Sequence, residues 1–207
     1  PQALRRAVMA RVQARLGPRE RLPAFFTGHA RDGAPVRSQD GGHLLFAFLP
    51  AEATLFVMAP HVVARRTHYA WEREHLSILD DSLWDFRELR AGPAGHLALR
   101  RRLIDRATHP AFAPARTWLN VTPYRVTRHA KTAGAHGALA LDLALECGRR
   151  GLPKPTVSPR TARGVSGVGL EGEAELRFEH LLAGPIVLGR NRHLGGGLFV
   201  STSPPSE

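Results

Sequence analysis

The 207-residue sequence has a single cysteine, Cys147, and its only lysines are Lys131 and Lys154. A lone cysteine excludes an internal disulfide framework and a zinc cluster built on cysteines. No apolar run reaches the roughly 18 residues that span a bilayer, and no secretory signal peptide opens the chain. These absences predict a protein that has no membrane partner and works in a reducing, cytoplasmic compartment.

Positive charge is abundant. The chain has 29 basic residues against 18 acidic ones, a net charge of +11 and a pI near 11.4, and all but two of the basic residues are arginine. Guanidinium groups bind phosphate in bidentate fashion and stack on bases, so this surplus favours a nucleic-acid partner over a small-molecule one. The alternative is a basic protein from an arginine-rich proteome.

The first half of the chain shows patterns of a helix, two strands, a helix and a strand, at residues 2–16, 43–49, 54–59, 67–90 and 96–104. The first helix is expected to stop at Gly17-Pro18. The two short apolar runs flank Pro50 and predict an antiparallel hairpin.

The second half shows patterns of a strand, a helix, a strand and two shorter strands, at residues 117–127, 137–150, 173–180, 186–188 and 198–200. Residues 153–172 are rich in proline and glycine and predict a long, mobile loop.

In order, the first half follows the ferredoxin-like arrangement βαββαβ without its first strand, and the second half follows a degenerate copy. We therefore expect an α+β protein of two tandem ferredoxin-like (RRM-like) units, residues 1–112 and 113–200, with a tail at 201–207. The chain begins at Pro1 rather than methionine, and we expect it to be the rear part of a longer polypeptide. Two such units side by side would present a sheet and loops to RNA.

The strongest single signal is the glycine-rich basic stretch at residues 183–200, AGPIVLGRNRHLGGGLFV. Glycine permits positive φ and close backbone approach, so amides there can meet phosphate oxygens while arginines neutralise charge. A plain β-hairpin with a flexible tip is the alternative. The candidate RNA-binding residues lie in this loop and in the basic segment after the strand at 117–127: Arg128, Lys131, Gly189, Arg190, Arg192, His193, Gly195, Gly196 and Gly197.

This stretch resembles the glycine-rich signature of the RAMP superfamily of CRISPR-associated proteins. More narrowly, it resembles the repeat-processing endoribonuclease that type I-U (I-G) systems carry as the nuclease half of a fused backbone-and-nuclease protein. Three further segments fit that family in the same order, FTGHARDGAP from Phe26, GHLLFAFLP from Gly42 and WLNVTPYRVTRHAK from Trp118. The sequence departs from the family just before His43, where relatives carry more histidines.

The resemblance implies cleavage of CRISPR repeat RNA without a metal or cofactor. A ribose 2′-hydroxyl would attack the adjacent phosphate, leaving a 2′,3′-cyclic phosphate and a 5′-hydroxyl. The resemblance also implies that the protein stays bound to the guide RNA, with other effector subunits, in a Cascade-type surveillance complex. Such a reaction needs a base, an acid and cations around the phosphorane.

Histidine suits the acid and base roles near neutral pH, and the chain has 11 histidines. The candidates are His29, His43 and His129, in that order. His29 lies in a glycine-flanked loop and His43 begins the first hairpin strand, so the two can converge on one site. His129 lies among cations and favours phosphate contact.

Two other functions fit parts of the pattern. One is a catalytically silent RNA-binding module that caps the 3′ hairpin of the guide RNA. The other is a cyclic phosphoesterase with two His-x-Ser/Thr motifs, and the sequences that begin at His43 and His96 lack the hydroxyl.

His61, His68 and His75 recur every seven residues. On one helix they would lie two turns, about 10.5 Å, apart, too far to share a zinc ion. No metal site is expected. Trp71, Trp84 and Trp118 fall on apolar stripes, which predicts core positions rather than base-stacking surfaces.

Overall fold

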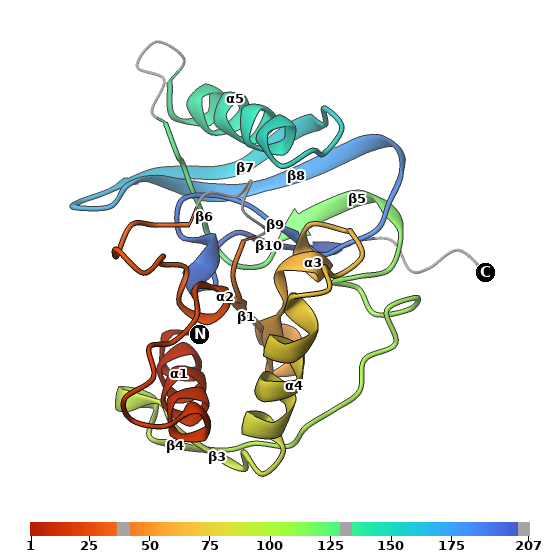
Figure 1. Cartoon of the computed structure of the whole chain (residues 1–207). Helices are drawn as coiled ribbons and strands as arrows, with labels where there is room; N and C mark the ends of the chain where they lie inside the picture. Colours follow the sequence, from red (N-terminus) through yellow and green to blue (C-terminus); the bar gives the residue numbers. More distant parts are fainter. Residues whose placement is uncertain (37–41, 129–133, 203–207) are drawn as a thin grey trace. The chain divides into compact units, whose positions relative to one another are not determined.

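The computed structural model describes residues 1–36, 42–128 and 134–202. The protein is α+β with antiparallel sheets (Figure 1). Its contacts divide the chain into two compact units. The first comprises Pro1–Phe46 and Leu55–Leu103, and the second comprises Ala47–Thr54 and Ile104–Glu207. Within the described ranges, no helix is long and apolar enough to cross a membrane.

The helices of the first unit are α1 (Gln2–Leu16), α2 (Ala24–Thr27), α3 (Pro60–Val63) and α4 (Glu72–Leu83). The strands form two separate ladders, β1 (Leu45–Leu49) with β2 (Thr54–Met58), and β3 (Glu88–Arg90) with β4 (His96–Ala98). The turn η2 (Pro50–Glu52) joins β1 to β2, and it belongs with the rest of Ala47–Thr54 to the second unit. A second turn, η3 (Gly92–Ala94), joins β3 to β4.

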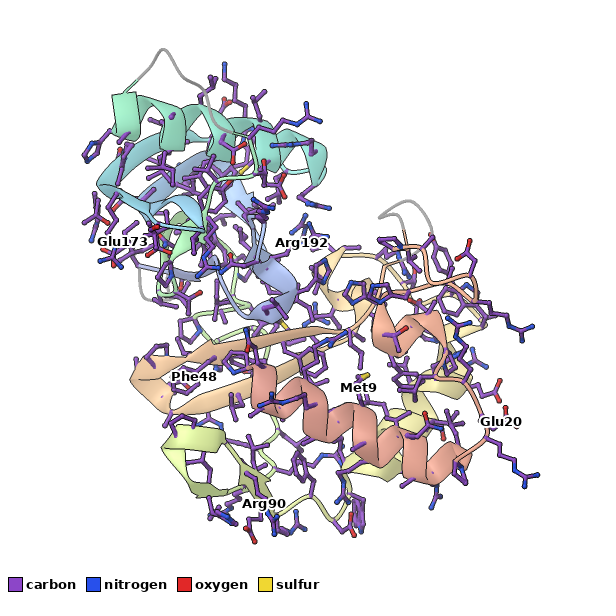
Figure 2. All side chains as sticks on the ribbon, turned by 90° about the vertical axis from the view of Figure 1, so that its left-hand side faces the viewer. Met9, Glu20, Phe48, Arg90, Glu173 and Arg192 are labelled. Carbon is purple, nitrogen blue, oxygen red and sulfur yellow. The ribbon has the colours of Figure 1, made fainter. Side chains whose placement is uncertain are left out.

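Helix α1 has the predicted bounds because Leu4, Val8 and Val12 recur every four residues and all three are buried. It ends at Gly17, whose φ is 106°. Helix α1 packs against α4 and β3, the element that carries Arg90 in Figure 2. The hairpin is confirmed. The predicted helix at 67–90 is too long, because residues 88–90 form β3 instead.

The second unit contains one long helix, α5 (Gly134–Arg149), and a six-stranded sheet. Its strands are β5 (Ala115–Asn120), β6 (Tyr124–Arg125), β7 (Thr156–Val165), β8 (Gly169–Leu182), β9 (Ile186–Val187) and β10 (Leu198–Ser201). The predicted strand at 117–127 is therefore divided into β5 and β6.

Strand β8 is central in this sheet. Leu176 pairs with Trp118 of β5 and with Val157 of β7, so these two strands lie on opposite edges of β8. Strand β6 continues along the β5 edge, β10 pairs with the other side of β5, and β9 pairs with β10. Helix α5 covers one face (Figure 1), and its apolar side chains share a core with residues of β5 and β8.

The expected loop at 153–172 is wrong: most of it forms the β7–β8 hairpin. Pro159 is tolerated because β7 is an edge strand and its pairing is irregular between Pro159 and Thr161. Gly172 allows β7 and β8 to approach closely, since a Cβ there would collide with the carbonyl oxygen of Thr161. The prolines and glycines that suggested a loop are edge-strand and close-approach residues.

The three tryptophans were predicted to lie in the core, and one of them does. Trp118 is fully buried in the second unit. In the first unit, by contrast, Trp71 is 46% exposed and Trp84 is 67% exposed. Both flank α4, beyond the stretch whose helical spacing turns side chains to the core.

Candidate functional site

The loop that carries His29 begins at the short helix α2. Phe25 and Phe26 are buried and fix this helix to the core of the first unit. Gly28 ends it with φ 78°, a left-handed conformation that side chains other than glycine adopt only with strain. The chain then forms a small, hydrogen-bonded hairpin in which His29 pairs with Pro35. His29 therefore lies in an ordered turn, and its side chain is exposed.

His43 lies directly against Gly28. A Cβ built at Gly28 would be 2.6 Å from Cδ2 and 2.7 Å from Nε2 of His43. The next residue, Leu44, donates its backbone N–H to the carbonyl of Phe25, which ties the chain before β1 to α2. His43 therefore lies next to the end of α2, although it is far from that helix along the chain.

The imidazole of His43 is fixed in one tautomer. Its Nδ1 lies 2.9 Å from the carbonyl oxygen of Leu44, and since a carbonyl only accepts, Nδ1 carries the proton. Burial lowers the pKa of His43, the nearby positive charges of Arg5 and His29 lower it further, and the bond to Leu44 opposes them. The lowered pKa favours the neutral, basic form of this ring at neutral pH.

His29 and Arg5 meet at one carbonyl. Nδ1 of His29 donates to the carbonyl oxygen of Thr27 at 3.2 Å, and Nη2 of Arg5 donates to the same oxygen at 3.1 Å. The Thr27 hydroxyl also accepts the backbone N–H of His29 at 3.1 Å. Both histidines therefore hold Nδ1 at a backbone carbonyl.

We define the histidine cluster as Arg5, Thr27, Gly28, His29 and His43. It offers a neutral base, an exposed imidazole and a fixed cation, the groups required to move a proton on and off a phosphoryl-transfer centre. His29 lies close enough to His43 for its charge to lower the pKa of that ring, and the use of both in one catalytic site stays a prediction. Sequence reasoning missed Arg5, because its helix is far from both histidines along the chain and nothing in its spacing distinguishes it from the other arginines of α1.

The glycine-rich loop belongs to the second unit and is closed by backbone contacts. Leu188 N–H donates to Gly197 O, and Gly197 N–H donates to Pro123 O. A Cβ at Gly197 would collide with the carbonyl of Leu188. Gly195 ends the helical turn η4 (Arg192–Leu194) with φ 92°.

Most loop amides are therefore already used. The N–H groups of six loop residues donate to carbonyls of the chain: Arg190, Arg192, Leu194, Gly195, Gly196 and Gly197. Gly189 has φ 99° and packs against Tyr124 and the carbonyl of Arg125. These glycines allow close backbone packing, and phosphate contact at this loop falls to side chains.

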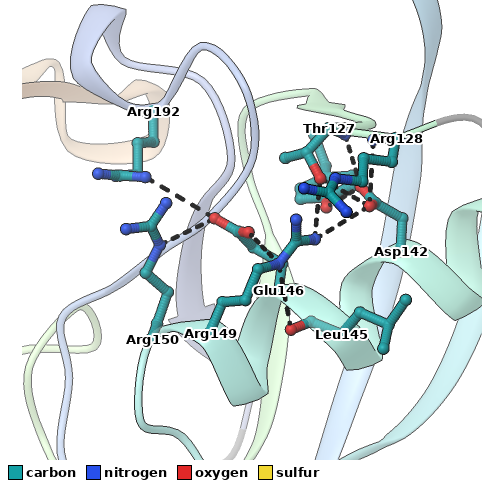
Figure 3. Close-up of polar contacts among 9 residues, drawn as sticks. Thr127, Arg128, Asp142, Leu145, Glu146, Arg149, Arg150 and Arg192 are labelled. Carbon is teal, nitrogen blue, oxygen red and sulfur yellow. Dashed lines mark hydrogen bonds and ion pairs between the residues drawn. The ribbon is translucent and has the colours of Figure 1, made fainter. Parts of the chain in front are cut away.

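The two loop arginines have different surroundings. Arg190 is exposed, whereas the Arg192 side chain is 16% exposed and lies 3.7 Å from Glu146 of α5 (Figure 3). Glu146 is buried and also pairs with Arg149 and Arg150. Arg192 therefore anchors the loop to α5. His193 is half-buried next to it.

A second buried carboxylate holds the segment after β6. Asp142 accepts hydrogen bonds from the Tyr124 hydroxyl, from the backbone and hydroxyl of Thr127, from Arg128 N–H and from Arg149 (Figure 3). Burial and the bond to Asp142 raise the pKa of Tyr124, which keeps its hydroxyl a donor. The Arg128 side chain itself is exposed. Sequence reasoning missed Asp142 and Glu146, although acidic residues four apart on the apolar face of a helix are a signal of buried ion pairs.

His129 and Lys131 lie outside the described residues. Of the seven-residue histidine series, His61 lies in α3, His68 in the connection and His75 in α4, so the three do not share a helix. Within residues 1–36, 42–128 and 134–202, no group of three His, Cys, Asp or Glu side chains is placed to hold a metal ion.

No protein-family model, curated protein or solved structure matches the chain.

Proposed function

We propose that the protein is a metal-independent endoribonuclease that cleaves CRISPR repeat RNA and remains bound to the product as a subunit of an effector complex. The observation that carries this proposal is the histidine cluster, in which His43 packs on Gly28 while His29 and Arg5 both contact the carbonyl oxygen of Thr27. Metal-free cleavage by the 2′-hydroxyl requires such a set.

In the proposed reaction, Nε2 of His43 takes the proton from the ribose 2′-hydroxyl, because that ring is neutral and its tautomer is fixed. The 2′-oxygen forms a bond to phosphorus as the bond from phosphorus to the 5′-oxygen breaks. His29, as imidazolium, gives a proton to the departing 5′-oxygen, and the Arg5 guanidinium stabilises the phosphorane. The products are a 2′,3′-cyclic phosphate and a 5′-hydroxyl.

The strand order of the second unit supports a ferredoxin-like origin for that unit. Strands β5 and β7 flank β8, with α5 between them in the sequence, which is a split βαβ arrangement, and β10 lies on the far side of β5. The glycine-rich loop stands where a second helix would be. In the first unit, α1, the β1–β2 hairpin and α4 follow the order of such a unit without its first strand, although the chain after α4 forms the paired strands β3 and β4 rather than one strand.

The test is cleavage of a labelled CRISPR repeat RNA in EDTA under single-turnover conditions. The proposal predicts a 2′,3′-cyclic phosphate product, and His43→Ala or His29→Ala should each slow cleavage by roughly 10²–10⁴-fold. His180→Ala changes an exposed histidine of the second unit and is the matched control. Tight binding without cleavage would support the capping module instead, and opening of an added cyclic phosphate would support the phosphoesterase.

A further inference from the structure

An exposed aromatic pair precedes α4 in the first unit. Tyr69 is 48% exposed and Trp71 is 46% exposed. Their rings stack, with centroids 6.1 Å apart and planes inclined by 23°. We define these two residues as the aromatic platform. Two large rings held together in solvent point to a binding surface rather than to core packing.

A buried ion pair holds the platform in place. The Arg66 guanidinium lies 3.9 Å from the centre of the Tyr69 ring, and its two terminal nitrogens donate to the carboxylate of Glu72 at 2.7 and 2.8 Å. That carboxylate also accepts the backbone N–H of Tyr69 at 2.6 Å. Burial alone would raise the pKa of Glu72, but these hydrogen bonds lower it below its usual value, so the pair stays charged. The platform is therefore preorganised.

The platform is joined to the histidine cluster through α2. The Trp71 ring meets Phe25 edge-on, with centroids 6.3 Å apart and planes 89° apart. Phe25 also lies 5.2 Å from the His75 ring. Three residues after Phe25 the helix ends at Gly28, against which His43 packs. One turn of helix thus separates the platform from the cluster.

We propose that the aromatic platform stacks on an unpaired base of the RNA beside the scissile phosphate. The identity of the ligand as RNA rests on the proposed function. Base stacking on aromatic rings is how proteins bind single-stranded nucleic acid. Glu72 balances the charge of Arg66, and the exposed Arg73 lies in the first turn of α4 beside the exposed Glu74. The attraction of this segment for RNA therefore comes from its aromatic faces. The platform thereby selects single-stranded over double-stranded RNA at the cleavage site.

The experiment measures binding of a labelled eight-nucleotide oligouridylate and of a blunt twelve-base-pair RNA duplex to the full chain by fluorescence anisotropy. Trp71→Ala and Tyr69→Ala should each weaken oligouridylate binding roughly ten-fold or more. Trp71→Phe should retain most of the affinity, because it keeps an aromatic face. The matched control is Trp84→Ala, an exposed tryptophan at the other end of α4, about 20 Å away.

Quenching of tryptophan fluorescence tests the same contact without removing the Trp71 ring, so it does not depend on whether the alanine variants fold. In a Trp84→Phe background, oligouridylate should quench the emission of Trp71, while the fully buried Trp118 remains unaffected. Absence of quenching, or equal affinity of Trp71→Ala and Trp84→Ala for oligouridylate, would overturn the proposal and leave the platform as a protein contact.

The repeat-cleavage assay separates this proposal from the proposed function. If the platform variants bind oligouridylate normally while His43→Ala abolishes cleavage, only the platform proposal fails. If Trp71→Ala loses affinity while neither His29→Ala nor His43→Ala changes the fate of the repeat RNA, the nuclease proposal fails and the platform stands.

Discussion

The imidazole of His43 rests on the Cα of Gly28, with Nε2 of the ring 2.7 Å from where a Cβ would be. Gly28 also has φ 78°. The same position therefore needs glycine twice, once for its backbone conformation and once for the space that His43 fills.

Gly28→Ala tests the second requirement. The added methyl displaces the His43 ring, and a misplacement of about 1 Å costs roughly 100-fold in rate. Gly33→Ala is the matched control: Gly33 has φ 86° but nothing within 4 Å of a built Cβ. Both variants should lose about 1–2 kcal/mol of unfolding free energy in thermal melts. Equal cleavage rates for the two variants would show that His43 placement is unimportant.

The rate of cleavage should depend on pH through His43. Because its pKa is lowered, the neutral base persists at pH values where an ordinary imidazole is protonated, and the acidic limb of the profile lies below the usual histidine value. Arg5 contributes to this lowering, since its charge disfavours the imidazolium. Arg5→Gln should therefore move the acidic limb to higher pH.

Arg6→Gln is the control for that experiment, because Arg6 is the exposed neighbour on α1 and loses the same charge. The measurement is the single-turnover rate from pH 4.5 to 8.5. An acidic limb that moves equally in both variants, or in neither, would contradict the role given to Arg5.

The glycine-rich loop should depend on Gly197 for stability. Its φ is 62°, and a Cβ would collide with the Leu188 carbonyl, so Gly197→Ala should cost about 2–4 kcal/mol of unfolding free energy. Gly167→Ala shares the positive φ, at 70°, but has open space, and should cost only about 1–2 kcal/mol. Chemical denaturation measures both, and equal losses would mean that the loop adapts.

Arg190→Ala and Glu146→Gln should have opposite effects: the first should weaken RNA binding, and the second should lower thermal stability. Arg190→Ala should leave the melting temperature unchanged, weaken RNA binding and reduce the slope of log affinity against log salt by about one. Glu146→Gln should instead lower the melting temperature, because Arg149, Arg150 and Arg192 lose a shared buried carboxylate. RNA affinity that is independent of salt would contradict nucleic-acid binding altogether.

Periodic patterns predicted the elements whose side chains alternate between core and solvent. Helix α1, the β1–β2 hairpin and helix α5 follow from apolar spacing, and in β8 Ala174, Leu176 and Phe178 are buried as expected. Such patterns work because burial repeats with the geometry of the element.

The sequence was less informative where a residue serves its tertiary neighbours. Pro159 and Gly172 suggested a loop, yet one lies on an edge strand and the other under the carbonyl of Thr161. Trp71 suggested a core position, yet it flanks α4 and is half exposed. In the histidine cluster, His29 and His43 could be predicted because histidine suits acid–base chemistry. The role of Arg5 could not, because it depends on the contact that α1 makes with Thr27.

The path of the glycine-rich loop is determined by backbone hydrogen bonds, by glycines without side chains and by the ion pair of Arg192 with Glu146. Its outward side chains, Arg190 and the 45% exposed Leu194, contribute nothing to that path. Substitution of these two side chains should therefore change what the loop binds while its backbone path stays the same. Within residues 184–197, the atoms that define the shape of the segment are therefore different from the atoms that it offers to a ligand.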